Sequence, residues 1–148
     1  MIRNFEEYTH EMTDKERDVV VPWLIKVLTL AVGKDKAVIN QNLVREFNYH
    51  QRLLYGDGKI TEDQIVKTRV SRIRKLIHII RVSDTIPMLL AGAKGYYISD
   101  DRDEIKTYIG SIEDRLRAIY QIRRALKRQL AKDRESQDGI QTKLVYHD

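Results

Sequence analysis

The chain contains no cysteine, which excludes disulfide bonds and thiolate metal sites. It also lacks an apolar run near the roughly 18 residues of a membrane span, and its first residues lack the apolar core of a signal peptide. These absences predict a cytoplasmic protein without a membrane partner.

Catalytic and metal-binding patterns are missing as well. The glycines at 56–58 and 92–95 lack the lysine and spacing of a phosphate-binding loop. The acidic residues at 100–104 are explained by the first turn of a helix, where the helix dipole favours negative charge. No histidine stands at a metal-ligand spacing from another; the four are His10, His50, His78 and His147. We therefore expect no enzyme, no cofactor and no metal site.

Positive charge is present in excess, and it is unevenly distributed. The net charge of the 148 residues is +5. Residues 1–60 are balanced, whereas residues 61–99 carry seven basic against three acidic groups, a local excess of +4. A second excess lies at 115–134, where eight cations accompany only Asp133. Basic segments of this kind are typical of nucleic-acid contact.

The first basic excess falls on residues 61–81, which the pattern predicts to be one long amphipathic helix. Thr61 would cap it, and the acids at 62–63 would occupy its first turn. An apolar stripe recurs at spacings of four and three: Val66, Val70, Ile73, Ile77 and Ile80.

The opposite face of this predicted helix carries the candidate DNA-binding residues. Arg and Gln side chains can pair with base edges in the major groove, and Lys with phosphates. The residues assigned to base edges are Gln64, Thr68, Ser71 and Arg72, and those assigned to phosphates are Lys67, Arg74 and Lys75. The alternative interpretation is a solvated helix face, because most exposed helices carry such residues.

The elements around this segment indicate a mainly α fold with a small β-hairpin. Thr13 and Glu16 form a capping-box pattern that opens a helix to about residue 32. A brief strand at 37–39, a short helix at 41–47 and a turn-rich loop at 48–60 follow. Two β-type runs then flank the turn at 92–95. This order is that of a winged helix, in which Lys94 would touch phosphate from the tip of the wing.

Residues 100–134 predict a long C-terminal helix with a heptad seam. A dimerisation surface is assigned to Ile109, Ile112, Leu116, Ile119, Arg123 and Leu126, with Arg123 as the polar position that sets register. Pairing with a second copy would bury the seam and give a homodimer, whose DNA half-sites would lie about 34 Å apart. The alternative is that the first half packs on the body and the basic half is solvated.

The stretch RVSRIRKLIHIIRVSDTIPMLLAGAKGYYIS at 69–99, with the following acidic start and helix, resembles a group of winged-helix proteins associated with phages and mobile elements. The resemblance covers roughly residues 13–128 and implies a winged-helix fold and DNA binding in gene regulation or replication of the element. The predicted parts are an N-terminal arm (1–12), a winged-helix domain (13–99), the C-terminal helix (100–134) and a flexible tail (135–148).

Two other functions stay open at this point. One is a non-catalytic interaction module that assembles a phage or replication complex through the C-terminal seam. The other is binding of single-stranded nucleic acid through Tyr96, Tyr97 and the basic segment at 117–134.

Overall fold

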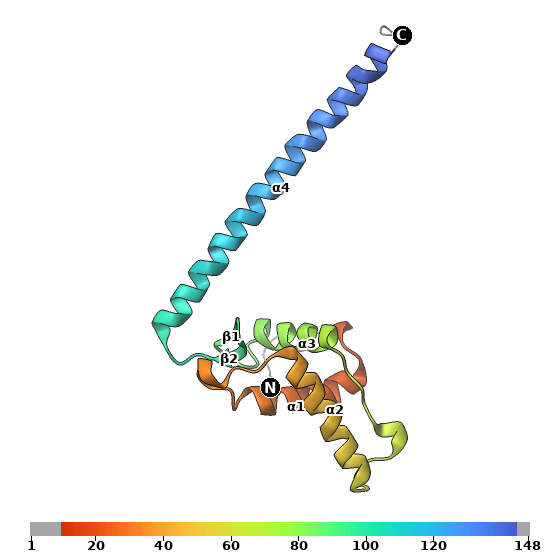
Figure 1. Cartoon of the computed structure of the whole chain (residues 1–148), viewed down its shortest axis with the longest axis vertical. Helices are drawn as coiled ribbons and strands as arrows, with labels where there is room; N and C mark the ends of the chain where they lie inside the picture. The colour runs from red at the N-terminus through yellow and green to blue at the C-terminus, as the bar shows by residue number, and fades with distance from the viewer. Residues whose placement is uncertain (1–9, 145–148) are drawn as a thin grey trace. The chain divides into compact units, whose positions relative to one another are not determined.

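The computed structural model describes residues 10–144, with side chains described to residue 138. The described part is mainly helical, with one antiparallel hairpin and a long C-terminal helix, as the sequence predicts (Figure 1). The chain divides into two compact units, Met1–Ile105 and Lys106–Asp148.

The first unit begins with the predicted capping box. Glu16 Oε1 accepts the backbone N–H of Thr13 at 2.9 Å, and Thr13 Oγ1 accepts the backbone N–H of Glu16 at 3.1 Å. A π-helical turn, Glu16–Val20, leads into helix α1, Val21–Leu28. Within the predicted arm, Met12 is buried against the core, and residues 1–9 lie outside the described residues.

Helix α2, Asn40–Gly56, is longer than the predicted helix at 41–47 and takes in most of the predicted loop. Leu43 and Phe47 point into the core, and Gln51 occupies the next buried position one turn later. A polar residue at that position interrupts the apolar period, which is why the pattern ended too early. The ring of Phe47 also packs edge to face against the ring of Trp23, the only tryptophan, with 5.3 Å between the two ring centroids.

The predicted long helix at 61–81 is wrong in its first half. Thr61 precedes a 3₁₀ turn, Glu62–Gln64, and helix α3 extends only over Val70–Val82. Between them the chain is not helical, although Val66 remains buried. Side chains of α2 satisfy the backbone there: Gln51 Oε1 accepts the N–H of Val66 at 3.1 Å.

The predicted hairpin is confirmed. Strands β1, Leu89–Gly92, and β2, Gly95–Ile98, pair antiparallel, with Gly92 opposite Gly95 at the turn. The predicted strand at 37–39 is reduced to one antiparallel bridge between Val38 and Tyr96. The 3₁₀ turn Lys34–Lys36 and the start of α2 at Asn40 leave room for no longer pairing.

One apolar core joins these elements. The buried face of α3 meets side chains of α1, α2 and the hairpin, and Arg81 Nε donates to the carbonyl of Leu89 at 3.1 Å. The core includes Val20, Leu24, Leu28, Leu43, Phe47, Ile73, Leu76, Ile77, Ile80 and Leu89. Because α3 is buried through its last turn, the hairpin that follows it in the chain packs on the same core.

Helix α4, Arg102–Leu144, makes up the second unit as far as residue 144. Asp101 Oδ1 accepts the backbone N–H of Asp103 at 2.9 Å, so an acidic side chain caps the helix start as expected. The helix continues past residue 134 through part of the expected tail, whose last residues, 145–148, lie outside the described residues. At 43 residues it measures about 65 Å, at about 1.5 Å per residue.

Candidate nucleic-acid interface

The exposed face of α3 is narrower than the sequence pattern indicated. Ser71, Arg74 and His78 are exposed on it, one turn apart along the helix. Arg74 forms no ion pair with any other residue in the described part of the chain. Its guanidinium therefore stays available to an external acceptor such as a phosphate or a base edge.

Arg72, which the sequence assigned to a base edge, lies on the flank of α3 and is held by Glu16. Its Nε donates to Glu16 Oε2 at 2.8 Å, and its NH2 donates to Oε1 at 2.7 Å. The same NH2 donates to the carbonyl of Glu11 at 3.1 Å. This bidentate pair joins the first turn of α3 to the π-helical turn that precedes α1.

Glu16 is the buried member of that pair, with 8% of its surface exposed. The hydrogen bonds from Arg72 are the main cause that lowers the pKa of Glu16 from its ordinary 4.5, against burial, which raises it; the backbone N–H of Thr13 lowers it further. Arg72 in turn has a raised pKa. The ion pair between Glu16 and Arg72 therefore has a structural role, because it joins the N-terminal segment to α3.

Lys75, assigned to phosphate, is likewise engaged by the N-terminal segment. Its Nζ lies 2.5 Å from Glu11 Oε2. The hydrogen bond from Lys75 is the main cause that lowers the pKa of Glu11, and His78 contributes through its charge. Glu11 therefore lies beside the α3 face and neutralises one of its cations.

The three candidates before α3 belong to the segment that is not helical. Gln64 Oε1 accepts the N–H of Thr61 at 2.8 Å and so closes the 3₁₀ turn. Lys67 is exposed and forms no ion pair with the residues that the structure describes. The N–H of Thr68 approaches Asn48 Oδ1 at 3.4 Å, and the buried Thr68 Oγ1 has no hydrogen-bond partner there.

The hairpin contributes one exposed cation, Lys94, at its turn. The two tyrosines that follow are both buried: Tyr96 is 8% exposed and Tyr97 4%. Tyr96 Oη also accepts a hydrogen bond from Asn40 Nδ2 at 3.3 Å. Neither ring offers a free face, so the single-strand interpretation loses the stacking platform it required.

Sequence reasoning did not assign Arg69, which is exposed immediately before α3. It also missed Arg52, which is exposed on α2 beside the segment at 65–67. Both residues become candidates only once α2 is extended to Gly56 and α3 is shortened to begin at Val70.

Helix α4 carries the second candidate surface, an apolar stripe exposed to solvent. Each of its large aliphatic side chains is between 49% and 70% exposed: Ile109, Leu116, Ile119, Ile122, Leu126 and Leu130. Ile112, the other aliphatic residue assigned to the seam, is half-buried. An exposed apolar stripe of this length on one helix is typical of a surface that a partner covers.

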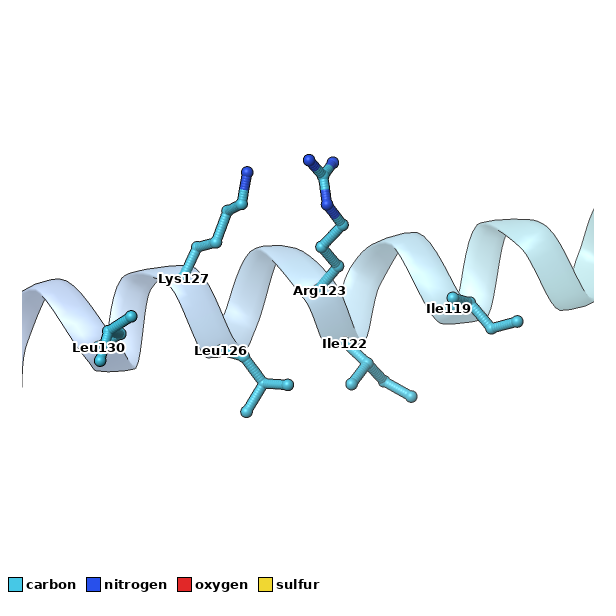
Figure 2. Close-up of a pocket in the computed structure, with 6 residues that line it drawn as sticks. All are labelled: Ile119, Ile122, Arg123, Leu126, Lys127 and Leu130. Carbon is cyan, nitrogen blue, oxygen red and sulfur yellow. The ribbon is translucent and has the colours of Figure 1, made fainter.

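In the middle of this stripe, Ile122 lies next to the predicted seam residue Arg123. Figure 2 shows Ile122 and Leu126 on one side of the helix and Arg123 and Lys127 on the opposite side. Six side chains line one shallow hollow along the helix: Ile119, Ile122, Arg123, Leu126, Lys127 and Leu130 (Figure 2). Arg123 therefore stays within the surface assigned to the seam, and Ile122 adds one more aliphatic side chain to it.

Comparison with known proteins adds no relative. The chain matches no family model, no curated protein and no solved structure. Within residues 10–144, no helix has the length and apolar character needed to cross a membrane, and no cluster of acidic and histidine side chains forms a metal site.

The Glu16–Arg72 pair predicts a specific loss of stability. Replacing Arg72 by Ala leaves the Glu16 carboxylate buried without its partner, which we expect to cost about 1–3 kcal/mol of unfolding free energy. Urea denaturation followed by Trp23 fluorescence measures it. Arg74→Ala, which removes the same charge from the exposed face of α3, is the control and should change stability by less than about 0.5 kcal/mol. Equal stability of the two variants would contradict a stabilising role of the Glu16–Arg72 pair.

The pH dependence of stability gives an independent readout of the same pair. The folded-state pKa of Glu16 lies below its ordinary 4.5, so the contribution of the pair is complete above about that pH and is lost as the pH falls through the folded pKa. Glu16→Gln should remove this part of the acid dependence.

Proposed function

We propose that residues 13–99 form a winged-helix domain that binds duplex DNA through α3, and that α4 joins two copies of the chain. The observation that carries the first part is the exposed Arg74 on the helix directly before the hairpin. The order of α1, the bridge at Val38, α2, α3 and the hairpin supports a winged helix.

The proposed interface is a revision of the one that the sequence pattern suggests. Arg74, Ser71 and His78 supply the α3 face, while Lys67, Arg69 and Lys94 supply cations at either side of it in the chain. Arg72 and Lys75 are assigned to internal ion pairs instead, because their charges are already met by Glu16 and Glu11. We assign the contact with a base edge or a phosphate to Arg74 instead.

Pairing of α4 follows from its exposed stripe. Full burial of a Leu or Ile side chain is worth about 1.5–3 kcal/mol, so covering the exposed part contributes about 1 kcal/mol for each side chain. Two copies of the stripe then supply on the order of 12 kcal/mol, against an association cost of about 4–15 kcal/mol. The gain is of the same size as the cost, which is consistent with a dimer of moderate affinity, and the two DNA-binding domains would engage neighbouring half-sites.

The test of DNA binding compares the wild type with Arg74→Ala. Fluorescence anisotropy with duplex DNA across roughly 50–300 mM salt should give a linear fall of log affinity with log salt for the wild type. Arg74→Ala should weaken binding by about 10- to 100-fold, because one Arg contact to a base contributes about 1–3 kcal/mol. Lys26→Ala, on the exposed side of α1, is the matched control and should bind as the wild type does.

An absence of salt-dependent binding in the wild type would contradict the DNA-binding function. The exposed stripe of α4 would then favour the second candidate, an interaction module without nucleic-acid contact. That function predicts association with a different protein through α4, which substitution of Leu126 by a charged residue would abolish.

A further inference from the structure

We propose that the pocket between α2 and residues 65–67 is a phosphate-binding site for the DNA backbone, with Arg52 and Lys67 as its ligands. This site deepens the proposed function, on which it rests. The pocket has a volume of about 320 Å³ and is lined by Asn48, Arg52, Ile65, Val66 and Lys67. That volume is at the low end of ligand pockets, which suits one small anionic group of a larger molecule.

The pocket has a rigid support. Gln51, which is 3% exposed, accepts the N–H of Val66 at 3.1 Å, and Asn48 Oδ1 approaches the N–H of Thr68 at 3.4 Å. These contacts fix the backbone on both sides of Lys67 against α2. Lys67 therefore extends from a backbone segment that is held against α2 on both sides.

The polar groups in the pocket match an oxyanion. Arg52 follows Asn48 by one helical turn, so both project from the same face of α2. A guanidinium, an ammonium and the amide nitrogen of Asn48 are all hydrogen-bond donors, and no carboxylate lines the pocket. Neither Arg52 nor Lys67 forms an ion pair with a residue in the described part of the chain. Two like charges at one pocket repel each other, and a bound phosphate removes that repulsion.

The position in the chain connects the pocket to the DNA-binding face. Lys67 precedes α3 by three residues, and its neighbour Arg69 directly precedes the helix. A phosphate held here would fix the position of the start of α3 on the duplex without reading its sequence. We therefore expect Arg52 and Lys67 to contribute affinity that is the same for every DNA sequence, in contrast to Arg74.

Arg52→Ala and Lys67→Ala should each weaken binding of duplex DNA equally for random and preferred sequences. Each should also reduce the slope of log affinity against log salt by about 1, the effect of one lost phosphate contact. Lys26→Ala is the control and should leave the slope unchanged. DNA binding with an unchanged slope in both pocket variants would overturn the site and leave DNA binding through Arg74 on α3 intact.

A second measurement examines the pocket without DNA. In NMR titrations of the full chain with inorganic phosphate, the amide signals of Val66 and Lys67 should shift saturably, and chloride at equal ionic strength should not reproduce the shift. The Arg52→Ala, Lys67→Ala double variant should lose it. If the wild type binds no DNA, the proposed function fails. The phosphate titration then decides separately whether the pocket binds phosphate, and the absence of a saturable shift would overturn the phosphate site.

Discussion

In the proposed dimer, substitution of both Ile119 and Leu126 by Asp should separate the two copies into monomers. These side chains are 62% and 58% exposed and belong to the stripe of α4 that a second copy would cover. Losing two apolar contacts and placing carboxylates in the interface should cost at least about 3 kcal/mol, which weakens association by about 100-fold or more. Sedimentation equilibrium across protein concentrations measures the change.

Gln121→Asp is the control, since it places one such carboxylate on α4 outside the stripe. It should leave the dimer intact. Circular dichroism adds a second readout, because a helix that loses its partner loses much of its stability and should melt earlier in the double variant. A monomeric wild type at tens of micromolar, or an unchanged dimer in the double variant, would contradict the assignment of the stripe to self-association.

Gly95→Ala should destabilise the first unit by about 3 kcal/mol or more. Gly95 begins β2 with φ at +115°, a backbone conformation that L side chains rarely adopt. An added Cβ would lie 2.2 Å from the carbonyl oxygen of Val38, which is backbone and can move only by breaking the bridge to Tyr96. Both backbone strain and steric overlap therefore oppose the substitution.

Gly58→Ala separates these two causes. Gly58 also has a positive φ, +71°, but an added Cβ there would meet nothing within 4 Å. It should cost only about 1 kcal/mol, the strain term alone. Urea denaturation followed by Trp23 fluorescence compares the two variants. Similar losses for both would mean that the hairpin can shift away from Val38 without penalty.

The Glu11 and Glu16 contacts show why the sequence pattern could not distinguish Arg72 and Lys75 from Arg74 on the α3 face. On a helical wheel, Arg72 and Lys75 are as suitable for DNA as Arg74, because the wheel contains no information about other segments. Glu16 is 56 residues away from Arg72 in the chain. Only the contact between the N-terminal segment and α3 shows which cation pairs with an acid and which one remains without an acidic partner in the described part of the chain.

Local patterns predicted several features correctly because short-range interactions determine them. The Thr13–Glu16 capping box, the hairpin about its glycine turn and the long helix after residue 100 depend on neighbours within a few residues. Periodicity also identified the buried face of α3 from Ile73 onward, although not its first turn.

The sequence by itself thus determined the mainly α composition, the hairpin, the amphipathic stripes and the places where positive charge gathers. The tertiary structure decided where α2 ends, where α3 begins and which charges stay unpaired. The physical reason lies in Gln51 and Asn48 on α2, whose side chains accept backbone N–H groups of Val66 and Thr68. These contacts satisfy hydrogen bonds that a helix would otherwise have made, and the segment before α3 remains extended with Lys67 beside Arg52.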